Sequence, residues 1–227
     1  MNINNAITEG AKILKNKFIY TYYLDSELLL SKAIGKERKY ILLNPYEKIS
    51  NYEIKIFKKL IKKRSFGKPI AQLINTKYFW DSKFYLTDDV LIPRPDTELV
   101  VENALKLTKF KNKLSVLDIG IGSGCILLSI LKERKNFIGT GLDISKKCLN
   151  ISKINATNLN LTSRFRLYKS DVDKFSIGKY DLIVSNPPYI NKHSIKYLER
   201  DVANFEPKLA LDGGLDGLSE IRKVIRK

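Results

Sequence analysis

The stretch LDIGIGSGC (117–125) places three glycines, Gly120, Gly122 and Gly124, between a short apolar run and a longer apolar segment. This order predicts a buried strand, a tight turn and a helix, because glycine lets the backbone turn sharply and approach a ligand. The G-x-G-x-G spacing departs from the dinucleotide-binding fingerprint, and no Lys-Ser/Thr pair follows to make a phosphate-binding P-loop. The turn therefore predicts a ligand site of another class at the carboxyl edge of a sheet.

Segments with strand character and segments with helical periodicity alternate on both sides of this turn. The strand-like segments lie at 113–120, 137–145, 164–172 and 179–186, and the helical ones at 99–110, 125–134 and 146–160. Such alternation is typical of βαβ units, in which helices connect parallel strands. We therefore predict an α/β domain over 93–227, Rossmann-like, with a mostly parallel, doubly wound sheet.

The chain before this domain has a different pattern. Residues 1–75 carry helical periodicity with few glycines, which predicts a small helical bundle. Gly35 is a candidate helix C-cap, and Ser50 or Asn51 is a candidate N-cap. Aromatic and β-branched residues with polar breaks at 76–92 predict a β-hairpin that links the bundle to the α/β domain.

Charge and cysteine content narrow the class of protein. The chain carries 41 Lys and Arg against 24 Asp and Glu, a net charge of +17, which attracts nucleic acid. The charge is spread along the chain, however, and its densest cluster, KIFKKLIKKR (55–64), has the spacing of a solvated helix face. Cys125 and Cys148 show no metal-site or disulfide spacing, and no secretory signal or membrane-spanning stretch is present. We therefore expect a cytoplasmic protein with no metal and no membrane association.

Three aspartates end or follow successive predicted strands: Asp118, Asp143 and Asp171. The carboxyl ends of parallel strands meet at one edge of a sheet, so we expect these side chains near the glycine turn. A carboxylate at Asp143 can accept hydrogen bonds from both ribose hydroxyls of an adenosine-containing ligand. Asp118 can steady the turn or meet a cationic ligand, and Asp171 lies where an adenine edge can be read. Each alone also fits a strand-end cap, whereas together they favour an adenosyl ligand.

The last predicted strand ends abruptly in Asn186-Pro187-Pro188-Tyr189. The prolines cannot continue a strand or a helix, and they hold the backbone rigid. The Asn186 side-chain oxygen and the Pro187 carbonyl can each accept one N–H of a planar NH₂ group, and the Tyr189 ring can pack on that group. Asn186 and Pro187 are therefore candidate catalytic residues, and all four are candidate substrate-binding residues. A plain strand-terminating turn is the alternative, because Asn-Pro is an ordinary turn dipeptide.

The glycine turn and the acid that ends the next strand resemble those of class I S-adenosylmethionine-dependent methyltransferases. This resemblance implies that S-adenosyl-L-methionine is the cofactor. The cofactor-binding residues that it implies are Asp118, Gly120, Ile121, Gly122, Ser123, Gly124, Asp143, Asp171, Val172 and Asn186. The Asn-Pro-Pro-Tyr stretch is similar to the motif of amide and exocyclic-amine N-methyltransferases, which implies methyl transfer to a planar nitrogen of a glutamine, an adenine or a guanine.

The stretch PRPDTE (93–98) resembles the same position in bacterial release factor glutamine methyltransferases. SFGKPIAQLINTKYFW (65–80) and FEPKLALDGGLDGL (205–218) extend the resemblance over nearly the whole chain. It implies methylation of the glutamine in the Gly-Gly-Gln loop of class 1 peptide chain release factors, giving N5-methylglutamine, with the helical bundle recognising the release factor. It also implies that Arg94 and Glu98 line the cofactor and substrate cavity.

Two alternatives stay open. A nucleic-acid N-methyltransferase acting on adenine or guanine fits the basic charge, although no target recognition domain is evident. Family members continue through further helices and three more strands, whereas this sequence ends at Lys227, so it resembles a C-terminally truncated member with its fourth strand at a sheet edge. An inactive binding module is therefore the second alternative. Otherwise we expect a monomer whose partner is the release factor, with no nucleic-acid requirement.

Overall fold

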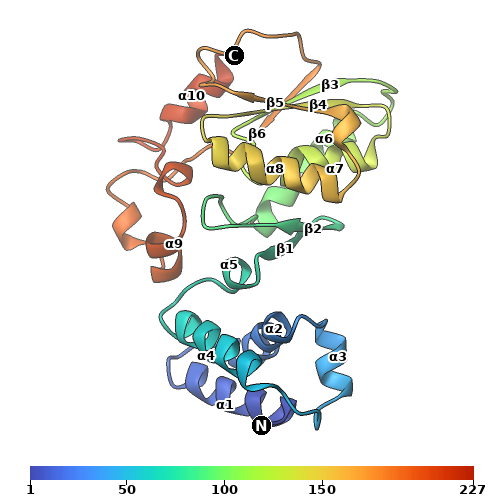
Figure 1. Ribbon diagram of the computed structural model, residues 1–227. Coiled ribbons are helices and arrows are strands. Elements are labelled where there is room, and N and C mark those ends of the chain that lie inside the picture. The colour runs from blue at the N-terminus through green and yellow to red at the C-terminus, as the bar shows by residue number, and fades with distance from the viewer. The chain divides into compact units, whose positions relative to one another are not determined.

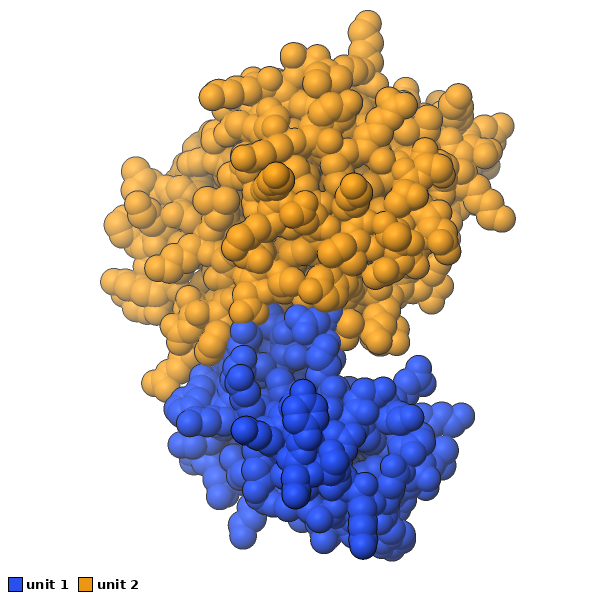
Figure 2. All heavy atoms as spheres, in the orientation of Figure 1, with its two compact units in different colours: residues 1–75 blue, residues 76–227 orange.

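The computed structural model describes residues 1–227, and the chain divides into two compact units, Met1–Asn75 and Thr76–Lys227. Figure 1 shows the secondary structure of both, and Figure 2 shows the first unit in blue and the second in orange. The first unit is all helical, whereas the second contains every strand. None of the helices combines the length and the apolar character needed to cross a lipid bilayer.

The first unit is a helical bundle around one hydrophobic core, as predicted. Its helices are α1 (Ile3–Lys15), α2 (Tyr22–Ile34), α3 (Arg38–Leu43), α4 (Asn51–Ser65) and α5 (Ile70–Ile74). Gly10 lets α1 approach its neighbours closely, because a Cβ there would lie 2.5 Å from the Ser26 Oγ and 2.7 Å from the Phe57 ring. The short helices α3 and α5 span only 6 and 5 residues, too few to show a helical period in the sequence.

Two predicted helix boundaries in this unit are confirmed. Gly35 ends α2 in the left-handed conformation, with φ of 66°. Ser50 caps α4 in a capping box: its side chain accepts the Glu53 N–H, and the Glu53 carboxylate accepts the Ser50 N–H. Near the other end of α4, Arg64 forms a 2.7 Å ion pair with the buried Asp25. The basic helix is thus anchored at both ends, while its lysines lie exposed.

The second unit begins with an antiparallel hairpin of β1 (Thr76–Phe79) and β2 (Ser82–Tyr85). Phe79 and Phe84 point into the core of this unit with their ring centroids 6.1 Å apart in an edge-to-face arrangement. At the turn, Trp80 has φ of 52°, and its indole Nε1 donates to the Glu133 carboxylate at 2.9 Å. The hairpin therefore packs as part of the α/β unit.

The main sheet has four parallel strands in the order β5-β4-β3-β6. These are β3 (Ser115–Ile119), β4 (Ile138–Asp143), β5 (Phe165–Lys169) and β6 (Leu182–Ser185). The chain adds β4 and β5 on one side of β3 and then returns to place β6 on the other side. The predicted α/β fold is confirmed, and the reversal between β3 and β6 creates the switch point at which such sheets bind ligands.

The two faces of this sheet carry separate hydrophobic cores. The larger core packs side chains of β3, β5 and β6 against α6 (Glu98–Leu107), α7 (Cys125–Glu133) and α8 (Lys146–Asn158). The smaller core, which includes Phe175, contacts α10 (Ser219–Ile225) through Val224. Shorter elements complete the unit: α9 (Arg200–Phe205) and the 3-10 turns η1 (Pro95–Thr97), η2 (Thr162–Arg164), η3 (Ile195–Tyr197) and η4 (Lys208–Ala210).

Candidate active site

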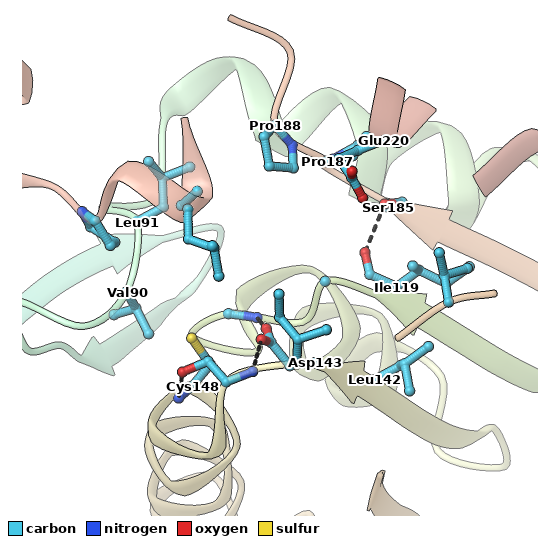
Figure 3. Close-up of a pocket in the computed structure, with 18 of the residues that line it drawn as sticks. Val90, Leu91, Ile119, Leu142, Asp143, Cys148, Ser185, Pro187, Pro188 and Glu220 are labelled. Carbon is cyan, nitrogen blue, oxygen red and sulfur yellow. Dashed lines mark hydrogen bonds between the residues drawn. The ribbon is translucent and has the colours of Figure 1, made fainter. Parts of the chain in front are cut away.

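A cavity of about 490 Å³ lies at the carboxyl ends of the strands in the second unit. Residues from the segments 88–91, 119–122, 142–148, 170–172, 185–188, 207–212 and 220–224 line it. In Figure 3, Val90 and Leu91, Asp143 and Cys148, and Pro187 and Pro188 surround it. The cavity therefore lies at the switch point of the sheet, where the tips of β3 and β6 meet.

The glycine-rich turn forms one wall of this cavity as an open cradle. Gly120, Gly122 and Gly124 have φ of 75°, 53° and 82°, a left-handed conformation that other residues rarely adopt. The N–H groups of Gly120 and Ile121 both donate to the Leu142 carbonyl, at 2.8 and 2.9 Å, which ties the turn to the end of β4. A Cβ on Gly120 would meet no atom within 4 Å. The backbone of the turn is thus fixed in place and accessible to a ligand.

Asp143 ends β4 and lines the cavity. Its Oδ2 accepts the Gly122 N–H at 3.0 Å, and its Oδ1 accepts the Ser145 N–H at 2.8 Å. Burial raises the pKa of this carboxyl, and the hydrogen bonds from these backbone N–H groups oppose the rise. Each oxygen keeps a second acceptor site. Asp143 therefore joins the glycine turn to β4 while still offering acceptors to a ligand.

Asp118 supports the turn from behind and does not line the cavity. Side chains alternate along a strand, so Asp118 points with Val116 toward the face covered by α7. It is 1% exposed, and neither carboxyl oxygen has a hydrogen bond partner of normal geometry. Burial raises the pKa of Asp118 to about 7; the nearby Leu127 N–H lowers it and the charge on Asp143 raises it further.

The other predicted cofactor residues near β3 and β5 divide into two groups. Asp171 and Val172, just after β5, line the cavity. Ile121, Ser123 and Gly124 do not line it. Ile121 is 4% exposed in the larger core, and the Ser123 carbonyl accepts a hydrogen bond from α8 at 2.9 Å. Gly124 caps α7, so these three residues hold the turn against the core.

The segment 186–189 directly follows β6 and carries two free acceptors, although Asn186 and Tyr189 themselves do not line the cavity. Pro187 and Pro188 line the cavity (Figure 3). Asn186 is half-buried, and its Nδ2 donates to the Thr97 Oγ1 at 3.2 Å. The Asn186 Oδ1 and the Pro187 carbonyl accept no hydrogen bond within the protein. Both oxygens are therefore available to a donor group.

The far end of this segment is held by the glycine-rich stretch that follows α9. Tyr189 is 63% exposed, while the Ile190 carbonyl accepts the Gly213 N–H at 2.9 Å. A Cβ on Gly213 would lie 2.8 Å from the Tyr189 Cα, and a Cβ on Gly217 would lie 2.6 Å from the Tyr189 carbonyl. Only glycine allows this close approach, so the stretch 205–218 fixes the backbone that carries the tyrosine ring.

Arg94 and Glu98 do not line the cavity, which differs from the sequence-based expectation. Arg94 forms an ion pair with Glu206, whose side chain is 1% exposed. Glu98 accepts the Trp80 N–H at 2.7 Å. The physical reason is that each charged side chain turns toward a partner within the protein and therefore not into the cavity.

Three parts of the cavity wall were not among the predicted site residues: residues in 88–91, at the start of α8, and in 207–224. The first two meet where the Cys148 thiol contacts the Asp89 carbonyl at 3.5 Å and Lys147 pairs with the Asp89 carboxylate at 2.7 Å. Burial raises the pKa of Cys148 to about 11, so it stays a neutral thiol. The start of α8 was recoverable in part, because it follows the strand that Asp143 ends. The other two parts come to the cavity through long-range packing.

Known proteins match both units. Residues 5–74 match the PrmC N-terminal domain, and residues 96–215 match the Methyltransferase small domain. The hMettl16 catalytic domain, solved in complex with the MAT2A 3'UTR hairpin 6, matches with a TM-score of 0.53 at 17% identity, over 63% of this chain and 55% of that chain. At that identity, the structural likeness bears on the fold alone.

Relatives in sequence cover nearly all of the chain. The release factor glutamine methyltransferase of Caulobacter vibrioides is 37% identical over 225 residues, which cover 99% of this chain and 78% of that protein. The enzyme of the same name from Buchnera aphidicola is 37% identical over 226 residues, which cover 100% and 80%. The chain therefore belongs to the release factor glutamine methyltransferase family.

Proposed function

We propose that this chain transfers a methyl group from S-adenosyl-L-methionine to the side-chain nitrogen of the Gly-Gly-Gln glutamine in class 1 peptide chain release factors. The observation that carries this proposal is the pair of free acceptors, the Asn186 Oδ1 and the Pro187 carbonyl, on consecutive residues of which Pro187 lines the cavity. A glutamine amide offers two N–H donors, one for each acceptor. The names of the relatives support glutamine over adenine or guanine as the acceptor.

The residues around the cavity fit this cofactor. Its bound form supplies an electrophilic methyl group on a sulfonium sulfur. Gly120 and Gly122 present open backbone to the cavity, since a Cβ on Gly122 would meet only the Gly120 carbonyl, at 3.9 Å. Asp143 has acceptor sites left for ribose hydroxyls, and Asp171 and Val172 line the part of the cavity after β5 that suits an adenine ring.

The two acceptors would prepare the glutamine amide for attack. An amide nitrogen is a poor nucleophile, because its lone pair is delocalised into the carbonyl. Hydrogen bonds from its two N–H groups to Asn186 Oδ1 and to the Pro187 carbonyl would aim the nitrogen and favour its pyramidal form. Pro187 and Pro188 add no backbone N–H that would compete for these oxygens. Tyr189 then offers its exposed ring for the flat amide to pack on.

No side-chain base is required in this scheme. After transfer the nitrogen carries an extra proton and is strongly acidic, so water can accept that proton. His193 is exposed, and its backbone N–H donates to the Asn191 side chain at 2.8 Å. We therefore assign no proton-transfer role to this histidine.

A labelling assay tests the proposal. The chain is mixed with methyl-labelled cofactor and either a release factor or a mixture of tRNA, rRNA and DNA. We expect label in the release factor, and none when its Gly-Gly-Gln glutamine is replaced by alanine. Label in nucleic acid and none in the release factor would instead establish a nucleic-acid N-methyltransferase, which the net charge of +17 would accommodate. Because release factors act at the ribosome, the proposed substrate implies a cytoplasmic reaction.

A further inference from the structure

A buried threonine holds the side chain that the proposed reaction depends on. The Thr97 Oγ1 accepts the only hydrogen bond that the Asn186 side chain makes, from Nδ2 at 3.2 Å across 89 residues of sequence. Thr97 is 8% exposed and does not line the cavity. Its side chain reaches the segment 186–189 through this hydrogen bond to Asn186.

The position of Thr97 is fixed from both sides. Its own N–H donates to the Arg94 carbonyl at 3.0 Å, which closes the η1 turn. Arg94 forms the ion pair with Glu206, and Glu98 accepts the Trp80 N–H at 2.7 Å. The hydroxyl is thus carried on a short turn whose two ends are bound to different parts of the second unit. Such a support can hold a partner side chain in one orientation.

Orientation matters for Asn186 because the two ends of a carboxamide have nearly the same shape and opposite hydrogen-bonding character. With Nδ2 bound to Thr97, the oxygen is left for the substrate, where it can accept an N–H. If the Asn186 carboxamide were rotated by 180° about χ2, its NH₂ group would face the NH₂ group of the substrate, and the two donors would repel. The torsion that separates these states is broad and roughly two-fold, so Asn186 itself does not choose between them.

We propose that Thr97 is a positioning residue: its hydroxyl serves as an acceptor for the Asn186 nitrogen, as in the structure, and so directs the Asn186 oxygen at the substrate amide. This rests on the proposed function, in which that oxygen accepts an N–H of the glutamine. The stretch PRPDTE then has a role beyond starting a helix. It links the orientation of Asn186 to the ion pair and the hairpin on either side.

Substitutions at Thr97 test the hydrogen bond. Thr97→Val keeps the shape and removes the hydroxyl, and we expect kcat to fall about tenfold, the value of one hydrogen bond. The KM for the release factor and the Kd for the cofactor should stay within about twofold, because Thr97 touches neither. Thr97→Ser, which keeps the hydroxyl, should restore kcat to within about threefold of the parent.

Thr108→Val is the matched control. Thr97 precedes the first residue of α6, and Thr108 follows its last residue. Thr108 is 5% exposed, and its hydroxyl donates to the Ala104 carbonyl at 2.7 Å. The same substitution there should lower the thermal stability as much as Thr97→Val does and leave kcat unchanged. An equal loss of kcat in both variants would mean that Thr97 acts only through general stability, and the proposal would be wrong.

A double-mutant cycle with Asn186→Asp separates orientation from structure. A carboxylate has an acceptor at both ends, so it needs no partner to choose its orientation. In the Asn186→Asp background, measured by single turnover, Thr97→Val should change the rate by less than about twofold. A loss as large as in the parent background would overturn the proposal, since Thr97 would then matter for some reason other than the amide.

A spectroscopic measurement does not depend on turnover. The side-chain NH₂ resonance of Asn186, assigned by its loss in Asn186→Asp, should exchange with solvent faster in Thr97→Val than in the parent or in Thr97→Ser. An unchanged exchange rate would contradict the hydrogen bond even if the chain were inactive. If instead the parent labels no release factor while this NH₂ group is protected, the proposed function fails and the contact stands.

Discussion

The two halves of the candidate site are assembled in different ways. The glycine-rich turn at 120–124 is bound to the tip of the adjacent strand, through the Leu142 carbonyl and the Asp143 carboxylate. The segment at 186–189 is held by Thr97 and by the backbone around Gly213, both far away in the sequence. On the proposed cofactor side, the glycine turn and Asp143 are therefore held together within one βαβ unit, whereas the proposed substrate side depends on several separate segments.

This difference predicts a separation of mutational effects. Substitutions in remote segments that contact 186–189 should lower turnover and leave cofactor affinity unchanged. Substitutions at the tips of β3 and β4 should instead lower the affinity for the cofactor and leave turnover at saturating cofactor unchanged. The contrast can be tested by measuring the cofactor Kd by calorimetry and kcat by labelling for the same variants.

The largest effects should come from removing one hydrogen-bond acceptor in each half of the candidate site. Asn186→Ala removes one of the two proposed acceptors, and we expect kcat to fall by about 10² to 10³ with cofactor Kd unchanged. Asp143→Ala should instead weaken cofactor binding by about 100-fold, because it removes hydrogen bonds to a charged acceptor and frees the Gly122 N–H. Near-normal turnover in Asn186→Ala would refute the acceptor role, and unchanged Kd in Asp143→Ala would refute the ribose site.

A smaller effect on turnover should follow from Gly213→Ala. The new Cβ would lie 2.6 Å from the Gly217 carbonyl and 2.8 Å from the Tyr189 Cα, so the backbone of the tyrosine must move. We expect kcat to fall about tenfold, since a displacement of this size disturbs substrate placement, with no change in cofactor Kd.

Gly35→Ala is the control for backbone strain at a substituted glycine. Gly35 has φ of 66°, and a Cβ added there would meet no atom within 4 Å, so the substitution adds only strain. It should lower the free energy of unfolding by about 1 kcal/mol and leave kcat unchanged. If Gly213→Ala also changed stability alone, the stretch 205–218 would have no specific role in placing Tyr189.

The sequence could predict that the glycine turn lies next to Asp143 but not which partner Arg94 would take, and the same difference in assembly explains why. A glycine turn and an acid at the next strand tip are neighbours within one βαβ unit, so their spacing in the sequence fixes their spacing in space. The role of Arg94 was predicted less well, because its partner Glu206 lies 112 residues away. No local pattern shows that a charged side chain will turn toward a buried partner and away from the cavity.

Asp118 is an intermediate case. Its place at the end of a strand was correctly predicted, but spacing alone does not say on which face of β3 it lies. The face follows from which neighbours are buried against α7, and this needs the packed core.

The ion pair behind the cavity should affect stability. Arg94→Ala leaves the Glu206 carboxylate buried with only the Ile92 N–H as a partner, and we expect a loss of about 3 kcal/mol in the free energy of unfolding. Denaturant unfolding measures this loss. Lys106→Ala is the control, because its pair with Glu102 on α6 is exposed, and it should cost less than about 1 kcal/mol. Equal losses in the two variants would mean that the buried pair stabilises the fold no more than the exposed pair does.

A smaller effect on stability than that of Arg94→Ala should be a pH-dependent one at Asp118, beneath the glycine turn. Its pKa in the folded chain is about 7 against a reference value of 3.8, so between these values the folded state holds a proton that the unfolded state has lost. Stability conferred at this residue therefore falls as the pH rises through that window and levels off above it. Asp118→Asn mimics the neutral acid at every pH. We expect its stability advantage over the parent to grow by about 2 kcal/mol from about pH 5 to about pH 7, measured by denaturant unfolding without cofactor.

The shape of that pH curve also sharpens the comparison between the two halves of the site. At about pH 3, below both pKa values, the acid is neutral in the folded chain and largely so in the unfolded one, so the advantage of the variant should no longer change with pH there, which serves as an internal control. An advantage that did not change with pH would mean that Asp118 is ionised in the folded chain and hydrogen-bonded. The glycine turn would then rest on an ionised Asp118 carboxylate. The proposed cofactor half would in that case depend on the packing around Asp118 as well as on the contacts within one βαβ unit.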